Sequence, residues 1–193
     1  DFFRFTKEEI QALFTAVFNI KLNPEQIDWL HEHSEGWPAF IRLVLHSYEI
    51  IPSKQHGSFF ALIQENYKKI AEDIFNYFAF EIFKNETKEN QNFLIDCSLF
   101  DYLNPDVCRV ITGKNDSQKI LDDLARRNAF VFSLPDCNYR FHSLYQDFLK
   151  SRFVNENRKK EIYMLVAEYC KERNNEEALR YYLLAENFTA AVK

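Results

Sequence analysis

Apolar residues along most of this chain recur at the spacing of amphipathic helices. In the first segment Ile10, Leu13, Phe14 and Val17 are spaced i, i+3, i+4, i+7, which places them on one helical face. The preceding Thr6-Lys7-Glu8-Glu9 has the residue types of a capping box, in which a Thr and a Glu three residues later satisfy each other's backbone N–H groups. The pattern therefore predicts a helix that starts directly after Thr6.

Two further helices are predicted on either side of a sharp corner. Asn23 and Pro24 suit the N-cap and the first helical position, so they start the second helix. The segment Ser34-Glu35-Gly36-Trp37-Pro38 then interrupts the periodicity. Gly36 can end a helix in the left-handed conformation, and Pro38 can start the next one. This corner has two interpretations: a tight helix-helix connection, or a rigid apolar proline face suited to packing on a flat ring.

A long fourth helical segment follows, from Phe59 to about Phe83, with a candidate break at Lys68-Lys69. Near its end the apolar residues lie around most of the helix circumference, which is typical of a helix buried on more than one side. They are Ile74, Phe75, Tyr77, Phe78, Phe80, Ile82 and Phe83.

The pattern changes after the polar stretch at residues 84–90. Three short helical segments come first, followed by two strand-like runs joined by a Pro135-Asp136 turn. Three helices and a β-hairpin in this order predict a winged helix. The helices are expected at about Lys88–Cys97, from Asn104-Pro105 to Gly113, and after a cap at Asp116 or Ser117; the strand-like runs are Phe130–Leu134 and Tyr139–Phe141.

His142 stands where the second strand-like run gives way to a helix from Ser143 to about Phe153. The last part of the chain is again helical, with two apolar faces on either side of an Asn174-Asn175 turn, as in a helical-hairpin repeat of the TPR type. We therefore expect a mainly α protein with a small β-hairpin. Its predicted parts are a helical lid region at residues 1–84, a winged-helix domain at 85–154 and the start of a helical arm at 155–193.

Composition narrows the range of functions. The 193 residues carry a net charge of −5, which argues against a protein built mainly to neutralise nucleic-acid phosphates. The four cysteines contain no Cys-x-x-Cys pair, the five histidines are scattered, and no apolar run approaches the length of a membrane span. We expect a cytoplasmic protein with reduced thiols, no metal, no catalytic residue and no membrane partner. Because the chain begins at Asp1 and stops inside a helical pattern, we expect it to be a piece of a longer protein.

Several segments, in order, resemble the MalT-like, LuxR-type transcription activators of the STAND class of signalling ATPases. Glu35-Gly36-Trp37-Pro38-Ala39 resembles their "GWPa" corner, and residues 75–82 resemble their "ifdYfaeEvl" helix. Residues 120–128 resemble "iLeeLerrN", and Tyr139 to Leu144 resembles "yRyHhLf". The similarity covers most of the chain.

The resemblance implies site residues and partners. Gly36 and Pro38 would pack near the adenine, and His142 would contact a phosphate of bound ADP. Ser143 stands where the family often has a second histidine, so a paired-histidine role is not available. The phosphate loop and Mg²⁺ site are not in this sequence, so ADP or ATP is expected in the longer protein and none on the isolated chain. The implied partners are a nucleotide-binding domain of the same chain, further copies in the active state, an unidentified inducer, and DNA through a separate C-terminal domain.

Three hypotheses follow. The first is a regulatory module of an ADP/ATP-switched transcription activator. The second is a helical protein-interaction scaffold. The third is direct DNA binding by the winged helix, whose expected recognition helix carries Lys119, Arg126 and Arg127 but also Asp116, Asp122 and Asp123. That acidic content suits a phosphate-lined groove poorly.

Overall fold

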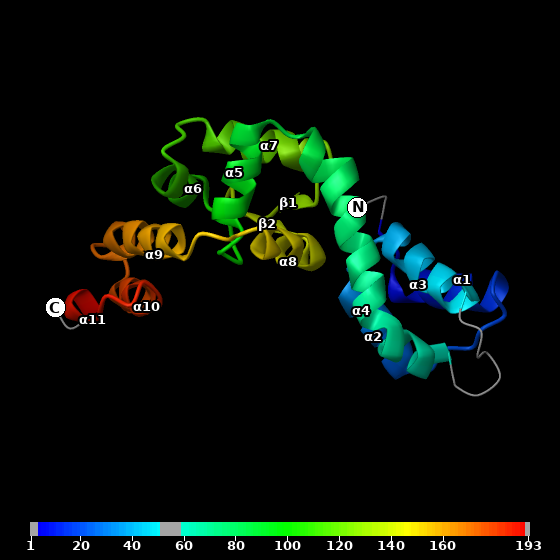
Figure 1. Cartoon of the computed structure of the whole chain (residues 1–193). Helices are drawn as coiled ribbons and strands as arrows, with labels where there is room; N and C mark the ends of the chain where they lie inside the picture. Colours follow the sequence, from blue (N-terminus) through cyan, green and yellow to red (C-terminus); the bar gives the residue numbers. More distant parts are fainter. Residues whose placement is uncertain (1–3, 51–58, 192–193) are drawn as a thin grey trace. The chain divides into compact units, whose positions relative to one another are not determined.

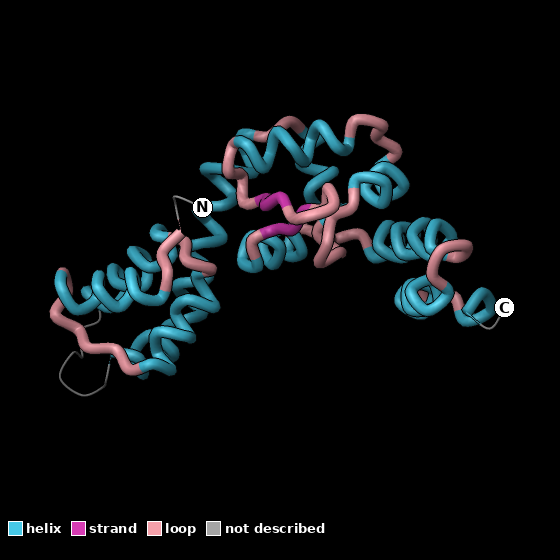
Figure 2. Tube along the Cα trace, turned by 180° about the vertical axis from the view of Figure 1, so that it is seen from behind, coloured by secondary structure: helices cyan, strands magenta, loops and turns pink. Residues whose placement is uncertain are grey.

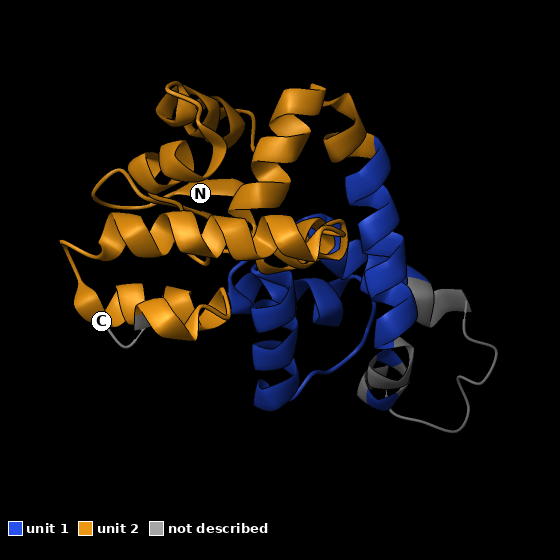
Figure 3. Ribbon diagram, turned by 60° about the vertical axis from the view of Figure 1, so that its left-hand side comes forward, with its two compact units in different colours: residues 1–80 blue, residues 81–193 orange. Residues whose placement is uncertain are grey.

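A computed structural model describes residues 4–50 and 59–191 of the chain. The chain divides into two compact units, residues 1–80 and 81–193, each described by itself below (Figure 3). Helices dominate both units, as predicted (Figure 1). In the part of the chain that the structure describes, no helix is both long enough and apolar enough to cross a bilayer.

Unit 1 consists of helices whose starts follow the predicted caps. The Thr6 hydroxyl accepts from the Glu9 N–H at 3.2 Å, and the Glu9 carboxylate accepts from the Thr6 N–H at 2.8 Å. Asn23 and Gln26 form the same reciprocal pair, with both distances at 2.9 Å. Both predicted helix starts are thus confirmed. The helices are α1 (Lys7–Ala16), α2 (Pro24–Ser34), α3 (Pro38–Ile50) and α4 (Phe59–Tyr77).

The core of unit 1 lies among these four helices, with consecutive helices packed in pairs. Fully buried side chains come from each of them: Ile10, Phe14, Leu30, Phe40, Ile41, Val44, Ile63, Ile70 and Ile74. They repeat at helical spacing because one stripe of each amphipathic helix faces the core.

The end of α4 differs from the sequence-based prediction. The helix runs unbroken past Lys68 and Lys69, so the candidate break there is wrong. The irregularity comes later, where five residues form the π-helical segment η1 (Phe78–Ile82). Ile74 and Phe78 are buried, but Tyr77 is 40% and Phe80 is 62% exposed. The apolar residues at the end of this segment are therefore not all buried, and burial of the helix on more than one side stays a prediction.

Unit 2 begins with a winged helix in the predicted element order. A short 3-10 turn η2 (Phe83–Asn85) leads into three helices, a β-hairpin and a further helix, which lie close together in Figure 1 and Figure 2. The bounds are α5 (Lys88–Cys97), α6 (Pro105–Thr112), α7 (Ser117–Arg126), β1 (Val131–Ser133), β2 (Tyr139–Phe141) and α8 (Ser143–Ser151).

The hairpin is antiparallel and short. Val131 pairs with Phe141 and Ser133 with Tyr139, while Leu103 adds an isolated bridge to Tyr139. The first strand is narrower than the predicted Phe130–Leu134 because Phe130 adopts a positive φ of 57°, which ends extended pairing. The core beneath the hairpin contains Phe93, Leu94, Cys97, Leu121, Leu124, Tyr145, Phe148 and Leu149.

One predicted cap in the winged helix is not formed. Asp116 occupies the N-cap position of α7 but makes no side-chain cap bond. The Ser117 hydroxyl instead donates to the Lys114 carbonyl at 2.7 Å. The turn before α7 is therefore held by a serine that reaches backward, and the start of α7 itself lacks a side-chain cap.

The last described part of the chain contains a helical hairpin, as the apolar pattern predicted, and its role as the start of a helical arm stays a prediction. Helices α9 (Glu156–Cys170) and α10 (Asn175–Leu184) pack closely together, and α11 (Phe188–Ala191) follows. Asn174 caps α10, as its type predicts, by accepting from the Glu177 N–H at 3.2 Å. The domain boundaries predicted at 84/85 and 154/155 stay predictions.

Candidate functional site

The Gly36 corner is built by close backbone contacts within unit 1. Glu35 and Gly36 have successive positive φ values of 45° and 75°. The Gly36 N–H donates to the Ser34 hydroxyl at 3.0 Å, and the Gly36 carbonyl accepts from the Phe5 N–H at 2.7 Å. A Cβ at Gly36 would lie only 2.6 Å from the Phe5 carbonyl oxygen. Glycine is thus required both by the left-handed conformation and by the backbone beside it.

Pro38 and Trp37, the next residues of the corner, have different surroundings. Pro38 is the first residue of α3 and is half-buried, which leaves part of its ring accessible. Trp37 stacks on Phe78, with ring centroids 5.5 Å apart and an interplanar angle of 16°. It also lies 5.6 Å from the ring of Tyr77. The corner is therefore joined to the end of α4 through an aromatic cluster, which the sequence did not predict.

His142 lies where the sequence predicted it, between β2 and α8. It is the N-cap of α8, where its Nδ1 accepts from the Leu144 N–H at 3.3 Å. The backbone N–H of His142 donates to the Phe130 carbonyl at 2.9 Å. The Phe130 ring meets the imidazole edge-on, with ring centroids 5.7 Å apart. Because Nδ1 accepts, the hydrogen of the neutral ring is assigned to Nε2, which leaves Nε2 as a donor. The residue is only 1% exposed.

The sequence-predicted site residues fall in different units. Gly36 and Pro38 share one corner in unit 1, while His142 belongs to unit 2. Nucleotide contact by these three residues stays a prediction.

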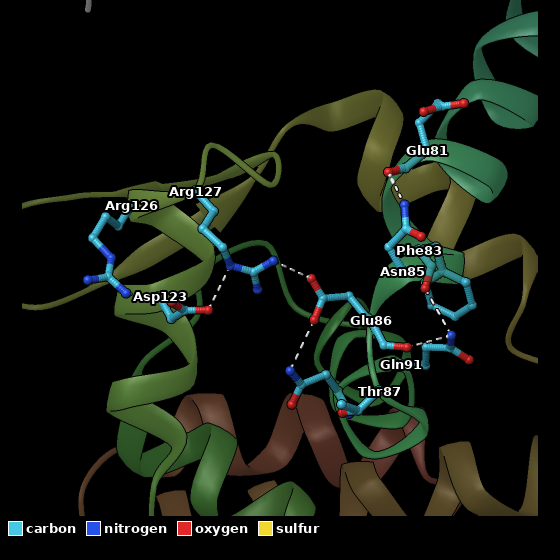
Figure 4. Close-up of polar contacts among 10 residues, drawn as sticks. Glu81, Phe83, Asn85, Glu86, Thr87, Gln91, Asp123, Arg126 and Arg127 are labelled. Atoms are coloured by element: carbon cyan, nitrogen blue, oxygen red, sulfur yellow. Dashed lines mark hydrogen bonds and ion pairs between the residues drawn. The ribbon is translucent and has the colours of Figure 1, made fainter.

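A polar network at the start of unit 2 was missed by the sequence analysis (Figure 4). Glu86 accepts from Arg127 at 2.8 Å, and Arg127 also donates to Asp123 at 2.7 Å. Arg126 donates to the other oxygen of Asp123 at 2.7 Å. The hydrogen bonds from Arg126 and then Arg127 lower the pKa of Asp123. The pKa of Arg127 is raised, first of all by its bond to Glu86. Two arginines of the expected recognition helix are therefore already engaged within the domain.

Side-chain amides fix the turn that enters the winged helix (Figure 4). The Gln91 amide donates to the carbonyls of Phe83 and Glu86, at 2.9 and 3.0 Å. The Asn85 amide donates to the Glu81 carbonyl at 2.8 Å. Gln91 is buried, and its amide adds a bond to each of two carbonyls at the end of the helical segment; the Phe83 carbonyl also accepts from the Glu86 N–H at 3.2 Å.

The helical hairpin is tied to the winged helix by Arg158. Its guanidinium donates from Nη2 to Asp96 and to the Ile111 carbonyl, both at 2.8 Å, and from Nε to Asp96 at 3.3 Å. These contacts border a cleft of about 470 Å³. Its lining also includes Glu89, Asn92, Phe93, Ile95, Thr112 and Lys114.

The pKa shifts of the Asp96–Arg158 pair show what the contact costs. Burial raises the pKa of Asp96, against the opposing effect of the bonds from Arg158. For Arg158, burial lowers the pKa, but the bonds that it donates to Asp96 and Glu161 outweigh this effect, and the net direction is upward. The raised pKa of Asp96 indicates that its charged form is disfavoured, whereas the raised pKa of Arg158 indicates that its charged form is favoured. The pair is attractive overall, because Arg158 donates two short charge-assisted hydrogen bonds to the same carboxylate.

Neither metal nor thiol chemistry is indicated. Within residues 4–50 and 59–191, no group of three or more His, Cys, Asp or Glu side chains is placed to hold a metal ion. Cys97, Cys108 and Cys170 are buried free thiols, and Cys137 is exposed. Burial raises the pKa of Cys97 well above its ordinary value, which keeps that thiol protonated and unreactive.

Comparison with known proteins shows what the chain is similar to. Residues 79–161 match the family model of the MalT winged helix domain. The HTH-type transcriptional regulator MalT of Vibrio cholerae is 25% identical over 147 residues, which cover 75% of this chain and 16% of that protein. The MalT regulator of Yersinia enterocolitica is 25% identical over 154 residues, which cover 77% of this chain and 16% of that protein.

The chain therefore spans about a sixth of the length of these relatives, because 16% of each is covered. The family match begins inside η1 and extends to the first residues of α9, so it includes the hairpin, His142 and Arg158. This polypeptide is MalT-like: its residues 79–161, which contain a winged helix, match the MalT winged helix domain model.

Proposed function

We propose that this chain is a regulatory module of a transcription regulator and that it responds to ADP and ATP. The MalT winged helix at residues 79–161 is the observation that carries the proposal, because the matched relatives are named as transcriptional regulators. His142 supports the nucleotide part. It is held at the end of the hairpin with Nε2 as a hydrogen-bond donor, the chemistry that a phosphate oxygen needs.

The mechanism rests on contacts that differ between two states. With ADP bound by a nucleotide-binding domain of the same protein, His142 donates to a phosphate and the Pro38 ring packs on the adenine. ATP together with an inducer favours an open form that associates with further copies. The inducer and the DNA contacted by a separate domain belong to the longer, cytoplasmic protein. This chain itself contributes no catalytic residue.

The three residues predicted to contact a nucleotide differ in their accessibility. Pro38 is half-buried and retains an accessible apolar face. A Cβ at Gly36 would meet the Phe5 carbonyl, so Gly36 shapes the corner, and its contact with a nucleotide stays a prediction. His142 is 1% exposed, so a phosphate reaches Nε2 only after its present cover is displaced.

Energies limit the role of any one contact. A hydrogen bond to a charged group contributes about 1.5–3 kcal/mol. Moving a two-state equilibrium from mostly closed to mostly open requires about 5.5 kcal/mol of differential binding. His142 is therefore one contact among several, and the corner and the domain interfaces supply the remainder.

The test uses a protein that carries this chain together with a nucleotide-binding domain. His142→Asn keeps a good N-cap acceptor for α8 but removes the Nε2 donor. We expect faster loss of ADP and higher reporter transcription without inducer, and the same from His142→Ala with added loss of stability. Ser143→Ala is the matched control at the next, exposed residue. Unchanged ADP release in His142→Asn would refute the phosphate contact.

Direct DNA binding by the winged helix is the weaker alternative. Arg126 and Arg127 are bonded to Asp123, and the Tyr139 hydroxyl donates to Asp122 at 2.6 Å. Breaking these bonds would reduce any gain from contact with phosphates. The scaffold alternative has more support, because large aromatic side chains such as Tyr102, which is 69% exposed, remain on the surface.

A further inference from the structure

Trp37 occupies a position that the proposed nucleotide contacts do not use. It stands between Gly36 and Pro38, so its backbone belongs to the corner itself. Its indole stacks on Phe78 at 5.5 Å, and Phe78 is fully buried. The side chain therefore links the corner to a residue forty-one positions later in the sequence.

Phe78 is the first residue of the π-helical segment η1 (Phe78–Ile82). π-helical turns are rare, because their hydrogen-bond geometry is less favourable than that of the α-helix, and they occur often at functional sites. A π turn holds one residue more than an α turn. Conversion between the two would rotate the backbone that follows by about 100° and shift it by about 1.5 Å.

Side chains hold this segment at both of its ends. Trp37 stacks on Phe78 at the start. At the other end Asn85 donates to the Glu81 carbonyl at 2.8 Å, and Gln91 donates to the Phe83 carbonyl at 2.9 Å (Figure 4). Between these contacts Phe80 is 62% exposed and Glu81 is exposed, whereas Ala79 and Ile82 are half-buried. A change at the Trp37 end is therefore able to alter the π turn without disrupting the bonds at the Gln91 end.

We propose that Trp37 couples the Gly36–Pro38 corner to the π-helical segment, so that a shift of the corner changes the backbone conformation of residues 79–82 ahead of the winged helix. This inference deepens the proposed function and rests on it for the ligand, because a nucleotide ring on Pro38 is what would move the corner. The mechanical link between corner and segment does not depend on the ligand, because it rests on the contacts of Trp37 with Phe78 and Tyr77.

The first experiment measures hydrogen exchange by mass spectrometry on the whole 193-residue chain. Trp37→Leu removes the stack, and the amides of residues 79–82 should exchange about three- to tenfold faster, the range that an aromatic pair contributes. Trp37→Phe retains a ring against Phe78 and should restore most of the protection. Trp29→Leu is the matched control, because Trp29 stacks on His33 in the same unit and meets α4 at Tyr67, eleven residues before Phe78.

Three outcomes would overturn the proposal. The first is unchanged exchange at residues 79–82 in Trp37→Leu. The second is an equal rise in Trp29→Leu. The third is a rise spread evenly over all of α1 to α4, which would show general loss of stability instead of coupling.

The second experiment perturbs the corner itself. Pro38→Ala should alter exchange at residues 79–82 by about threefold or more in the wild-type background, the lower end of what an aromatic pair transmits, and by less than about 1.5-fold in the Trp37→Leu background. Equal effects in both backgrounds would refute coupling through Trp37. Both experiments are done without nucleotide. Unchanged ADP release in His142→Asn would therefore refute the proposed function. Unchanged hydrogen exchange at residues 79–82 would refute the coupling through Trp37.

Discussion

The bonds of Arg158 give the prediction with the clearest magnitude. Arg158→Met keeps the length and apolar stem of the side chain but removes every donor. It leaves the Asp96 carboxylate, whose side chain is 17% exposed, without this partner, and the Ile111 carbonyl loses its bond from α9. We expect unit 2 to be destabilised and the hairpin α9–α10 to lose its tie to the winged helix.

The size of the effect follows from burial. Breaking a fully buried ion pair costs about 3–5 kcal/mol, and an exposed pair is worth about 0–1 kcal/mol. With side-chain exposures of 30% for Arg158 and 17% for Asp96, the pair lies between these limits. Including the lost bond to the carbonyl, we expect Arg158→Met to lower the free energy of unfolding by about 2–3 kcal/mol.

Urea unfolding followed by circular dichroism measures this change. The matched control is Arg109→Met, because Arg109 pairs with Asp106 on the surface, with exposures of 50% and 57%. It should cost less than about 0.5 kcal/mol. A double-mutant cycle of Arg158→Met with Asp96→Asn isolates the pair. A coupling energy no larger than that of Arg109 and Asp106 would refute the reasoning.

The pH dependence provides a second check. Burial raises the pKa of Asp96, so the folded state binds the proton more tightly than the unfolded chain does. The protonated Asp96 carboxyl therefore contributes stability below the pKa of about 4 that it has in the unfolded chain. This contribution is lost as pH rises through its pKa in the folded state. In Arg158→Met the unpaired carboxylate becomes more costly still. The difference from wild type should therefore be smaller near pH 4 than at pH 7, and a larger difference at pH 4 would contradict this account.

Two further predictions concern the corner and the entry turn. Gly36→Ala combines a positive φ with a clash on the Phe5 carbonyl and should lower the free energy of unfolding by more than about 2 kcal/mol. The control Gly113→Ala has a φ of 70° but open space around the new Cβ, and should lower it by about 1 kcal/mol. Equal shifts of the thermal midpoint in the two variants would contradict the clash. Gln91→Ala removes the amide that donates to two carbonyls and should lower the free energy of unfolding in urea by about 2 kcal/mol. The control Asn92→Ala, at an exposed residue, should lower it by about 0.5 kcal/mol or less. An effect of Gln91→Ala as small as that of the control would contradict the role of the amide.

Features fixed by neighbouring residues could be predicted from the sequence. The caps at Thr6, Asn23 and Asn174 were predictable because each bond joins residues three apart. The order of helices and hairpin was predictable for a related reason, since periodicity and turn residues are local. The position of His142 at the strand-to-helix junction followed from the same signals.

Features that depend on distant residues could not be predicted. Arg158 and Asp96 are sixty-two residues apart, and only the packing of α9 beside α5 and α6 brings them together. The π-helical segment was missed because its residues have the same apolar spacing as an α-helix. The burial of His142 was missed because a polar residue at a junction gives no sign of which rings will cover it.

The anchoring of α9 by Arg158 also has a mechanical consequence. Arg158 lies in the first turn of α9 and Cys170 is the last residue of the helix, so about 18 Å of helix extend beyond Arg158. The ring of Tyr163, 6.1 Å from that of Phe100, adds a second contact in the first half of the helix. Because the helix is stiff, a rotation of the winged helix about Arg158 by about 10° would carry the far end of α9 through about 3 Å, by the geometry of a rod of that length. A small tilt at the domain would thus become, at the far end of the arm, a displacement comparable to the width of a side chain.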